Sequence, residues 1–226
     1  MLRGRKAAQI KGLDQYDFDK LAKTEGSPRE RRRFLVFAHL QEGKTFTETA
    51  GVEIESVDIW FQDEARVGQR GTVTRTWANK GTRPRLARQQ QFEYAYIFGA
   101  ICPVRDEAVG LVMPAVNTEA MLVHLEYISM KIPEGRHAVI VLDRAAWHTT
   151  KRLKRFSNIS LLPLPPVSPE LNPTEQVWQT LRDEHLANRC YEDYDAITMA
   201  CCDAWNAFVD TPTRVRRLCS RPWAIL

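Results

Sequence analysis

The stretch HAVIVLD at residues 137–143 decides the fold that we expect for this chain. It is apolar at nearly every position, whereas a half-exposed strand would alternate between apolar and polar residues. A short, continuously apolar run of this kind is typical of a central strand buried on both faces, as in a parallel sheet covered by helices. The sequence therefore predicts an α/β fold built around this strand.

Downstream of this strand, helices and strands alternate. We expect a short helix near residues 149–156 and a strand at 159–164. The proline-rich stretch PLPPVSPELNP then leads into a helix from Pro173 to about Arg189, and the last long helix spans about 193–209. Parallel strands need crossover connections of this kind, so this half of the chain predicts the parallel part of the sheet.

Before the buried strand at 137–143, several short strands follow one another in the sequence. We expect strands at residues 56–63, 73–78, 93–102 and 109–115. Antiparallel pairing through short turns suits them. A helix then runs from the capping residue Asn117 to about Lys131. The order of elements predicts an α/β sheet in which an antiparallel part comes first and a parallel part follows.

The composition excludes several classes of protein. With 226 residues and 44% hydrophobic content, the chain suits one globular domain with a small appendage. No apolar run approaches the ~18 residues of a membrane span, and the N-terminus lacks an apolar signal region, so we expect neither membrane insertion nor secretion. The five cysteines follow no disulfide or zinc spacing, which favours a reducing cytoplasm.

The net positive charge of the chain is small, but its basic residues are clustered in the sequence. The net charge is +4, but Arg31, Arg32 and Arg33 stand together and further arginines gather near the C-terminus. Such clusters attract phosphate backbones. A solvated helix face is the plainer interpretation of any one cluster.

Three carboxylates mark the expected site. Asp63 ends the first strand, Asp143 ends the most buried strand, and Glu175 opens the helix after the proline-rich stretch. Strand ends and the helices that follow them converge at one edge of an α/β sheet. Carboxylates gathered there without a cation would repel one another. Mg²⁺ prefers such oxygen ligands, and two ions about 3.5–4 Å apart can promote an in-line displacement at phosphorus.

Each acid also has a structural interpretation. Asp63 lies in QDEAR, where an acid at a strand end often serves a turn or a salt bridge. Glu175 ends the string Asn172-Pro173-Thr174-Glu175, which fits a capping box with proline at the first helical position. Residue types and spacing alone leave these alternatives open.

Three longer strings add a resemblance. They are WFQDEARVGQRGTVTRTWANKGTRP (60–84), VLDRAAWHTT (141–150) and LLPLPPVSPELNPTEQVWQTLR (161–182). In this order they resemble the catalytic domain of mariner-superfamily transposases, and most of all the bacterial insertion-sequence branch of that superfamily. The resemblance extends over roughly residues 54–226.

The resemblance implies a ribonuclease-H-like mixed sheet flanked by helices, and a catalytic, metal-binding triad of Asp63, Asp143 and Glu175. It implies two Mg²⁺ or Mn²⁺ ions as cofactors. The activity implied is DNA end cleavage and strand transfer in cut-and-paste transposition. Its partners would be transposon terminal repeats and target DNA at TA, for a homodimer in the bacterial cytoplasm, associated with the nucleoid.

Further residues near the motifs are candidates for DNA contacts. Arg66 lies close to Asp63 and could touch phosphate, as could Arg31–Arg33. His148, five residues after Asp143, could contact DNA or orient a ligand, and a structural hydrogen bond is an equal alternative. We expect Trp147 and Trp178 to be packing aromatics rather than base-stacking platforms.

The N-terminal part departs from the resemblance. Residues 1–53 look like the start of a helix-turn-helix unit that stops before a recognition helix, and the catalytic domain, residues 54–226, follows at once. We therefore expect weakened sequence-specific end binding. An alternative function is a non-catalytic, truncated remnant that binds DNA or dimerises and inhibits transposition. Another is a different ribonuclease-H-like nuclease, such as a resolvase.

Overall fold

The computed structural model describes residues 56–71, 73–74, 77–82, 85, 89–150, 152–153, 156–164 and 171–220, together with Lys20. Apart from Lys20, the predicted N-terminal segment 1–53 lies outside the described residues, and Arg31, Arg32 and Arg33 lie there with it. The division at residue 53 therefore stays a prediction.

A five-stranded mixed sheet forms the centre of the molecule, with the order β3-β2-β1-β4-β5. Its strands are β1 (Val57–Gly68), β2 (Tyr94–Cys102), β3 (Glu107–Met113), β4 (His137–Leu142) and β5 (Ile159–Pro163). The first three pair antiparallel, whereas β4 pairs parallel with both β1 and β5. This arrangement confirms the predicted mixed sheet, whose antiparallel part comes first.

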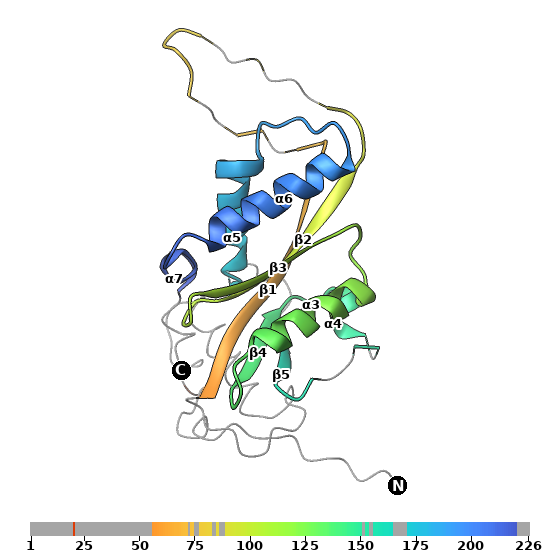
Figure 1. Cartoon of the computed structure of the whole chain (residues 1–226), viewed down its shortest axis with the longest axis vertical. Coiled ribbons are helices and arrows are strands. Elements are labelled where there is room, and N and C mark those ends of the chain that lie inside the picture. Colours follow the sequence, from red (N-terminus) through yellow and green to blue (C-terminus); the bar gives the residue numbers. More distant parts are fainter. Residues whose placement is uncertain are drawn as a thin grey trace.

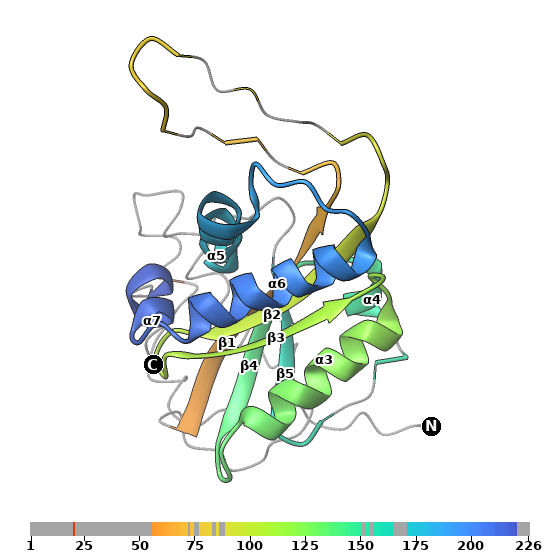
Figure 2. The ribbon, with the colours of Figure 1, turned by 45° about the horizontal axis from the view of Figure 1, so that its top comes forward.

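Helices cover both faces of the sheet (Figure 1). One face carries α3 (Thr118–Lys131) and the short α4 (Ala146–Thr149). The other carries α5 (Thr174–Leu181), its π-helical continuation η4 (Arg182–Leu186), α6 (Tyr194–Val209) and α7 (Arg214–Cys219). Figure 2 shows α6 running across β2 and β3, which it contacts. No helix in this described part of the chain has the length and apolar character to cross a bilayer.

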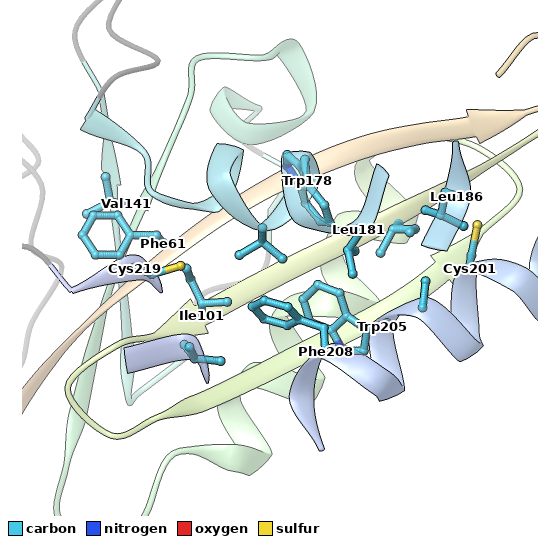
Figure 3. Close-up of a cluster of buried hydrophobic side chains, with 14 of the residues drawn as sticks. Phe61, Ile101, Val141, Trp178, Leu181, Leu186, Cys201, Trp205, Phe208 and Cys219 are labelled. Carbon is cyan, nitrogen blue, oxygen red and sulfur yellow. The ribbon is translucent and has the colours of Figure 1, made fainter. Parts of the chain in front are cut away.

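The two faces of the sheet bury separate hydrophobic clusters, because successive strand residues point to opposite faces. Phe61 and Val141 belong to the cluster under α5, α6 and α7, which Figure 3 shows around Trp178. Trp60 and Ile140 belong to the cluster under α3. The central strand β4 is buried at all six positions, as its apolar sequence predicted. By the same alternation, Asp63 faces α5 and Glu64 faces α3 and α4.

Two expectations about local structure were wrong. Of the strand expected at 73–78, the described residues 73, 74, 77 and 78 lie outside any strand. Instead of pairing in the sheet, the backbone N–H of Thr74 donates to Oδ1 of Asn188 (3.1 Å), and the Asn188 amide donates back to the Thr74 carbonyl (3.2 Å). The helix expected near 149–156 is α4, which ends at Thr149.

The two long helices each begin at a capping side chain. Asn117 caps α3, as predicted, by accepting a hydrogen bond from the backbone N–H of Ala120 (2.8 Å). Asp193, for which no cap was predicted, caps α6 in the same way through Ala196 (2.8 Å). The helix expected from Pro173 to Arg189 begins at Thr174 and ends at Leu186. It changes to π-helical hydrogen bonding at Arg182.

Candidate active site

Asp63 and Asp143 lie toward the carboxyl end of β4. In the parallel pairing of β1 with β4, Phe61 stands opposite Val141, and each aspartate follows that pair by two residues. The expectation that Asp63 ends its own strand was also wrong. β1 continues past Asp63 to Gly68, because these residues stay paired with β2.

The start of α5 is fastened to β1 beside Asp63. The Asn172 amide donates to the carbonyl of Gln62 (2.9 Å), and the Thr174 hydroxyl donates to the carbonyl of Phe61 (3.2 Å). Both side chains are buried. Because Glu175 follows Thr174 directly, these two bonds hold its backbone next to the strand that carries Asp63.

Asp63 has an unusual electrostatic environment. Burial raises its pKa from 3.8 to about 7, and the charges of Glu175 and Glu64 raise it as well. The Trp178 indole N–H donates to its Oδ2 at 2.9 Å, which favours the ionised form and lowers the pKa. Burial, the largest cause, raises the pKa of any carboxyl group, and a cation bound beside Asp63 would lower the pKa again.

A glycine on the neighbouring strand makes room for this contact. Asp63 stands opposite Gly99 of β2. A Cβ atom added to Gly99 would lie 2.5 Å from Cη2 of Trp178. The absence of a side chain at Gly99 therefore lets the Trp178 ring pack on the sheet, among the cluster drawn in Figure 3.

Asp143 is more exposed than Asp63, and His148 holds it. Its Oδ1 accepts a hydrogen bond from the backbone N–H of Ala145 (2.9 Å) and lies 2.7 Å from Nδ1 of His148. The other ring nitrogen of His148, Nε2, lies 2.9 Å from Oε1 of Glu64. Burial acts to lower the pKa of His148, but the hydrogen bond and charge of Glu64, with those of Asp143, raise it overall.

Glu64 is the residue that the sequence analysis missed. Besides His148, its Oε1 accepts hydrogen bonds from the side chains of Gln62 (2.9 Å) and Trp147 (3.3 Å). The side chain is only 8% exposed. The alternation of β1 offered one signal, because an acid beside Asp63 must face the opposite side of the sheet.

The three predicted acids have different electrostatic surroundings. Asp63 and Glu175 are close enough for the charge of one to shift the pKa of the other, whereas the carboxylate of Asp143 is engaged by His148. Within the described residues, no group of three or more histidine, cysteine, aspartate and glutamate side chains is placed to hold a metal ion. The metal-binding role of the triad therefore stays a prediction.

The capping interpretation of this helix start is borne out in part. α5 begins at Thr174, but Pro173 already has helical backbone angles (φ −68°, ψ −11°), as predicted for a proline in the first turn. Asn172 still accepts a hydrogen bond from the backbone N–H of Thr174 (3.1 Å). Glu175 is exposed, and among the described residues its carboxylate makes no bond back to the backbone of Asn172. It is therefore available for another role.

The predicted DNA contacts stay untested. Arg66 is exposed, and its guanidinium lies 4.6 Å from the ring centroid of Tyr94. His148 is buried with both ring nitrogens beside carboxylates. These contacts are structural hydrogen bonds, the alternative considered for this residue, and its role toward DNA or a ligand stays a prediction. Trp147 and Trp178 pack against the two hydrophobic clusters, as expected.

A mixed sheet with helices on both faces, and with two aspartates toward the carboxyl end of its most buried strand, is the arrangement of a ribonuclease-H-like domain. The chain matches the family model described as DDE superfamily endonuclease over residues 58–198. The match covers more than half of the chain, and the chain belongs to this family. An uncharacterized protein, y4pE/y4sA of Sinorhizobium fredii (strain NBRC 101917 / NGR234), is 51% identical over 131 residues, which are 58% of this chain and 97% of that protein.

Solved structures with the same fold include complexes of Mos1. The Mos1 strand transfer complex aligns with a TM-score of 0.54 and 16% identity, over 94% of this chain and 59% of that chain. The Mos1 mariner paired end complex with Mn aligns with a TM-score of 0.57 and 17% identity, over 86% of this chain and 60% of that chain. The chain thus spans about three fifths of the length of these Mos1 chains. At these identities the likeness concerns the fold.

The family match and the shared fold agree with the resemblance drawn from the three motifs, at the level of the DDE superfamily and the fold. The chain carries the catalytic domain of a DDE-type endonuclease on a ribonuclease-H-like fold, as predicted. They do not favour the alternative of a non-catalytic remnant. The family match begins at residue 58, close to the predicted start of the catalytic domain.

Proposed function

We propose that this domain belongs to a transposase that cuts DNA at the ends of an insertion sequence and joins the released 3′-hydroxyl groups to target DNA. The observation that supports the proposal is the fastening of the start of α5, which carries Glu175, to the strand that carries Asp63, with Asp143 toward the same end of β4. The acids lie in the three motifs that resemble mariner-superfamily transposases.

Asp63, Asp143 and Glu175 are the residues that would hold divalent cations. Carboxylate oxygens suit Mg²⁺ and Mn²⁺, and one of the Mos1 complexes with this fold contains Mn. The pKa of Asp63, raised to about 7 by burial and by its acidic neighbours, fits a position that a cation would stabilise. Two bound cations supply the charge that activates the attacking hydroxyl and offsets the leaving oxygen.

The residues of this chain have separate tasks in that reaction. The Trp178 N–H bond keeps one oxygen of Asp63 fixed and favours its ionised form. Asn172 and Thr174 hold the start of α5 against β1, so that Glu175 stays beside Asp63. Exposed arginines such as Arg66 would contact the DNA backbone, and the cluster Arg31–Arg33 would add to this.

The proposed partners follow from the same assignment. They are the terminal repeats of the element, a TA-containing target, and a second copy of the chain, because the two ends of an element must be brought together. The place of action would be the bacterial cytoplasm, at the nucleoid. The Mos1 structures are described as strand transfer and paired end complexes, which supports the pairing of ends.

The test is Mn²⁺-dependent cleavage of a plasmid that carries the inverted repeats flanking the reading frame. Asp63→Asn, Asp143→Asn and Glu175→Gln should each reduce cleavage at least ~100-fold, since each removes a ligand from the site. Glu126→Gln is the matched control, because Glu126 is an exposed acid on α3, which covers the other face. Full activity in a triad variant removes that residue from the mechanism. DNA binding without any cleavage by the unaltered chain supports the non-catalytic remnant instead.

A further inference from the structure

We propose that His148 is a positioning residue for Asp143. It holds Oδ1 of that aspartate, while Glu64 holds His148, so that the other oxygen, Oδ2, is presented to a divalent cation. The inference rests on the proposed function, in which Asp143 is a metal ligand.

The contacts of Asp143 are one-sided. Its side chain is 59% exposed and follows the end of β4, so packing alone does not fix it. Oδ1 lies within hydrogen-bond distance of two nitrogens, the backbone N–H of Ala145 and Nδ1 of His148. Oδ2 has no hydrogen bond among the described residues. Two donors on one oxygen restrict the rotation of the carboxylate and leave the second oxygen for a ligand.

His148 is itself held firmly. Its side chain is fully buried, and Nε2 lies 2.9 Å from Oε1 of Glu64. The indole of Trp147 stands edge-on to its ring, with the centroids 5.7 Å apart. An imidazole bonded through both nitrogens has a fixed plane, so the direction from Nδ1 to Asp143 is fixed as well.

Glu64 connects this arrangement to β1. Its Oε1 also accepts bonds from Gln62 and Trp147, so that one oxygen serves three donors. It stands next to Asp63 on the strand but on the other face of the sheet. A single pair of neighbouring residues in β1 therefore supplies one candidate ligand, Asp63, and anchors the orientation of the other, Asp143.

The same contacts distinguish positioning from direct metal binding. Glu64 faces α3 and α4 with little exposure, whereas Asp63 and Glu175 interact on the α5 face. His148 has carboxylate oxygens at both nitrogens, which leaves neither of them for a cation. Glu64 and His148 would therefore not bind the cation themselves. They would act by orienting the carboxylate of Asp143.

Two substitutions of His148 separate its nitrogens. The amide nitrogen of asparagine reaches the place of Nδ1, and that of glutamine reaches the place of Nε2. Mn²⁺ binding to the metal-free 226-residue chain is measured by electron paramagnetic resonance titration. His148→Gln loses the bond to Asp143 and should raise the Kd for Mn²⁺ roughly tenfold or more. His148→Asn keeps that bond but loses the anchor at Glu64, so it should raise the Kd by a smaller factor, about threefold.

Two control variants make the outcomes distinct. Asp143→Asn sets the loss expected when the ligand itself is removed. His137→Gln changes another buried histidine, at the opposite end of β4, where Nε2 contacts the Ser160 hydroxyl at 2.9 Å; it should leave the Kd unchanged. Near-ultraviolet circular dichroism checks the fold of every variant.

If His148→Gln is folded and binds Mn²⁺ like the unaltered chain while Asp143→Asn does not, the inference is wrong and the proposed function stands. If Asp143→Asn binds Mn²⁺ like the unaltered chain, Asp143 is not a metal ligand. The inference about His148 is then wrong, and so is the role of Asp143 in the proposed function. Should His148→Gln fail to fold, Glu64→Ala replaces it. This variant removes the anchor of His148 and should also weaken binding; unchanged binding in it overturns the inference.

Discussion

The indole nitrogen of Trp178 donates a hydrogen bond to Oδ2 of Asp63 at 2.9 Å. Three residues earlier in the same helix stands Glu175, whose charge raises the pKa of that same carboxyl group. One turn of α5 thus brings Asp63 a group that favours its ionised form and a group that disfavours it. Burial is the largest cause of the raised pKa, and the backbone N–H and the charge of Glu64 contribute besides these two groups.

Trp178→Phe tests the first of these contacts. The substitution keeps an aromatic ring but removes the donor, so the pKa of Asp63 should rise above its value of about 7. Carbon-detected NMR titration of the aspartate carboxyl groups, without metal, measures it. Trp205→Phe is the matched control, because Trp205 packs against Trp178 with ring centroids 6.0 Å apart and does not bond Asp63. An unchanged pKa in Trp178→Phe contradicts the assignment.

The pH dependence of stability tests the buried carboxyl group itself. The pKa of Asp63 in the folded chain is about 7, above the ordinary 3.8. Between these values the unfolded chain binds fewer protons at this group than the folded chain does, so stability falls as the pH rises. Asp63→Asn removes this dependence. Its Tm relative to the unaltered chain should therefore increase from pH 4 to about 7 and then level off.

Thermal unfolding in EDTA at pH 4, 6 and 8 measures this difference. Because all other titrating groups are shared by the two chains, their contributions largely cancel in it. Mn²⁺ added at pH 8 should reduce the difference, since a cation that binds the unaltered site stabilises the folded state. A difference that does not change with pH would show that Asp63 ionises normally.

The sequence predicted the fold because its main signals are local. The apolar run of β4 and the cap Asn117 need no knowledge of the tertiary structure, and both were confirmed. The strand expected at 73–78 was wrong because a strand requires a partner, and Asn188, more than a hundred residues away, bonds Thr74 instead.

The site was predictable only in part. The motifs identified three acids, but they said nothing about which side chains would hold them. Trp178 was expected to pack, and it does, yet its bond to Asp63 depends on the space above Gly99. The role of Glu64 depends on how β1 and the loop after β4 are placed. Such contacts arise from tertiary register, which residue spacing does not encode.

Gly99→Ala tests the space that Trp178 occupies. The new Cβ would lie 2.5 Å from Cη2 of Trp178 and 2.9 Å from Cη2 of Trp205, and two indole rings packed in a core have little freedom to move. Overpacking of this kind costs about 1–3 kcal/mol in the free energy of unfolding. Urea unfolding measures it. Gly71→Ala is the control, because its nearest neighbour would be the Gly68 carbonyl at 3.4 Å. Equal stability of the two variants contradicts the steric argument.

The opposite end of β1 offers a test of stability that is independent of the acidic site. Asp58 is buried, and Nε and Nη2 of Arg136 each donate to its carboxylate at 2.7 Å. Asp58→Ala leaves this partly buried guanidinium without its partner and should lower the free energy of unfolding by ~3 kcal/mol. The exposed pair of Arg152 with Glu119 is the control, and Glu119→Gln should cost less than ~1 kcal/mol. Since Asp58 lies at the other end of the sheet from Asp143, its loss should leave Mn²⁺ affinity unchanged in the folded variant. If the folded Asp58→Ala variant also lost Mn²⁺ affinity, the start of β1 and the acidic site would not be independent of each other.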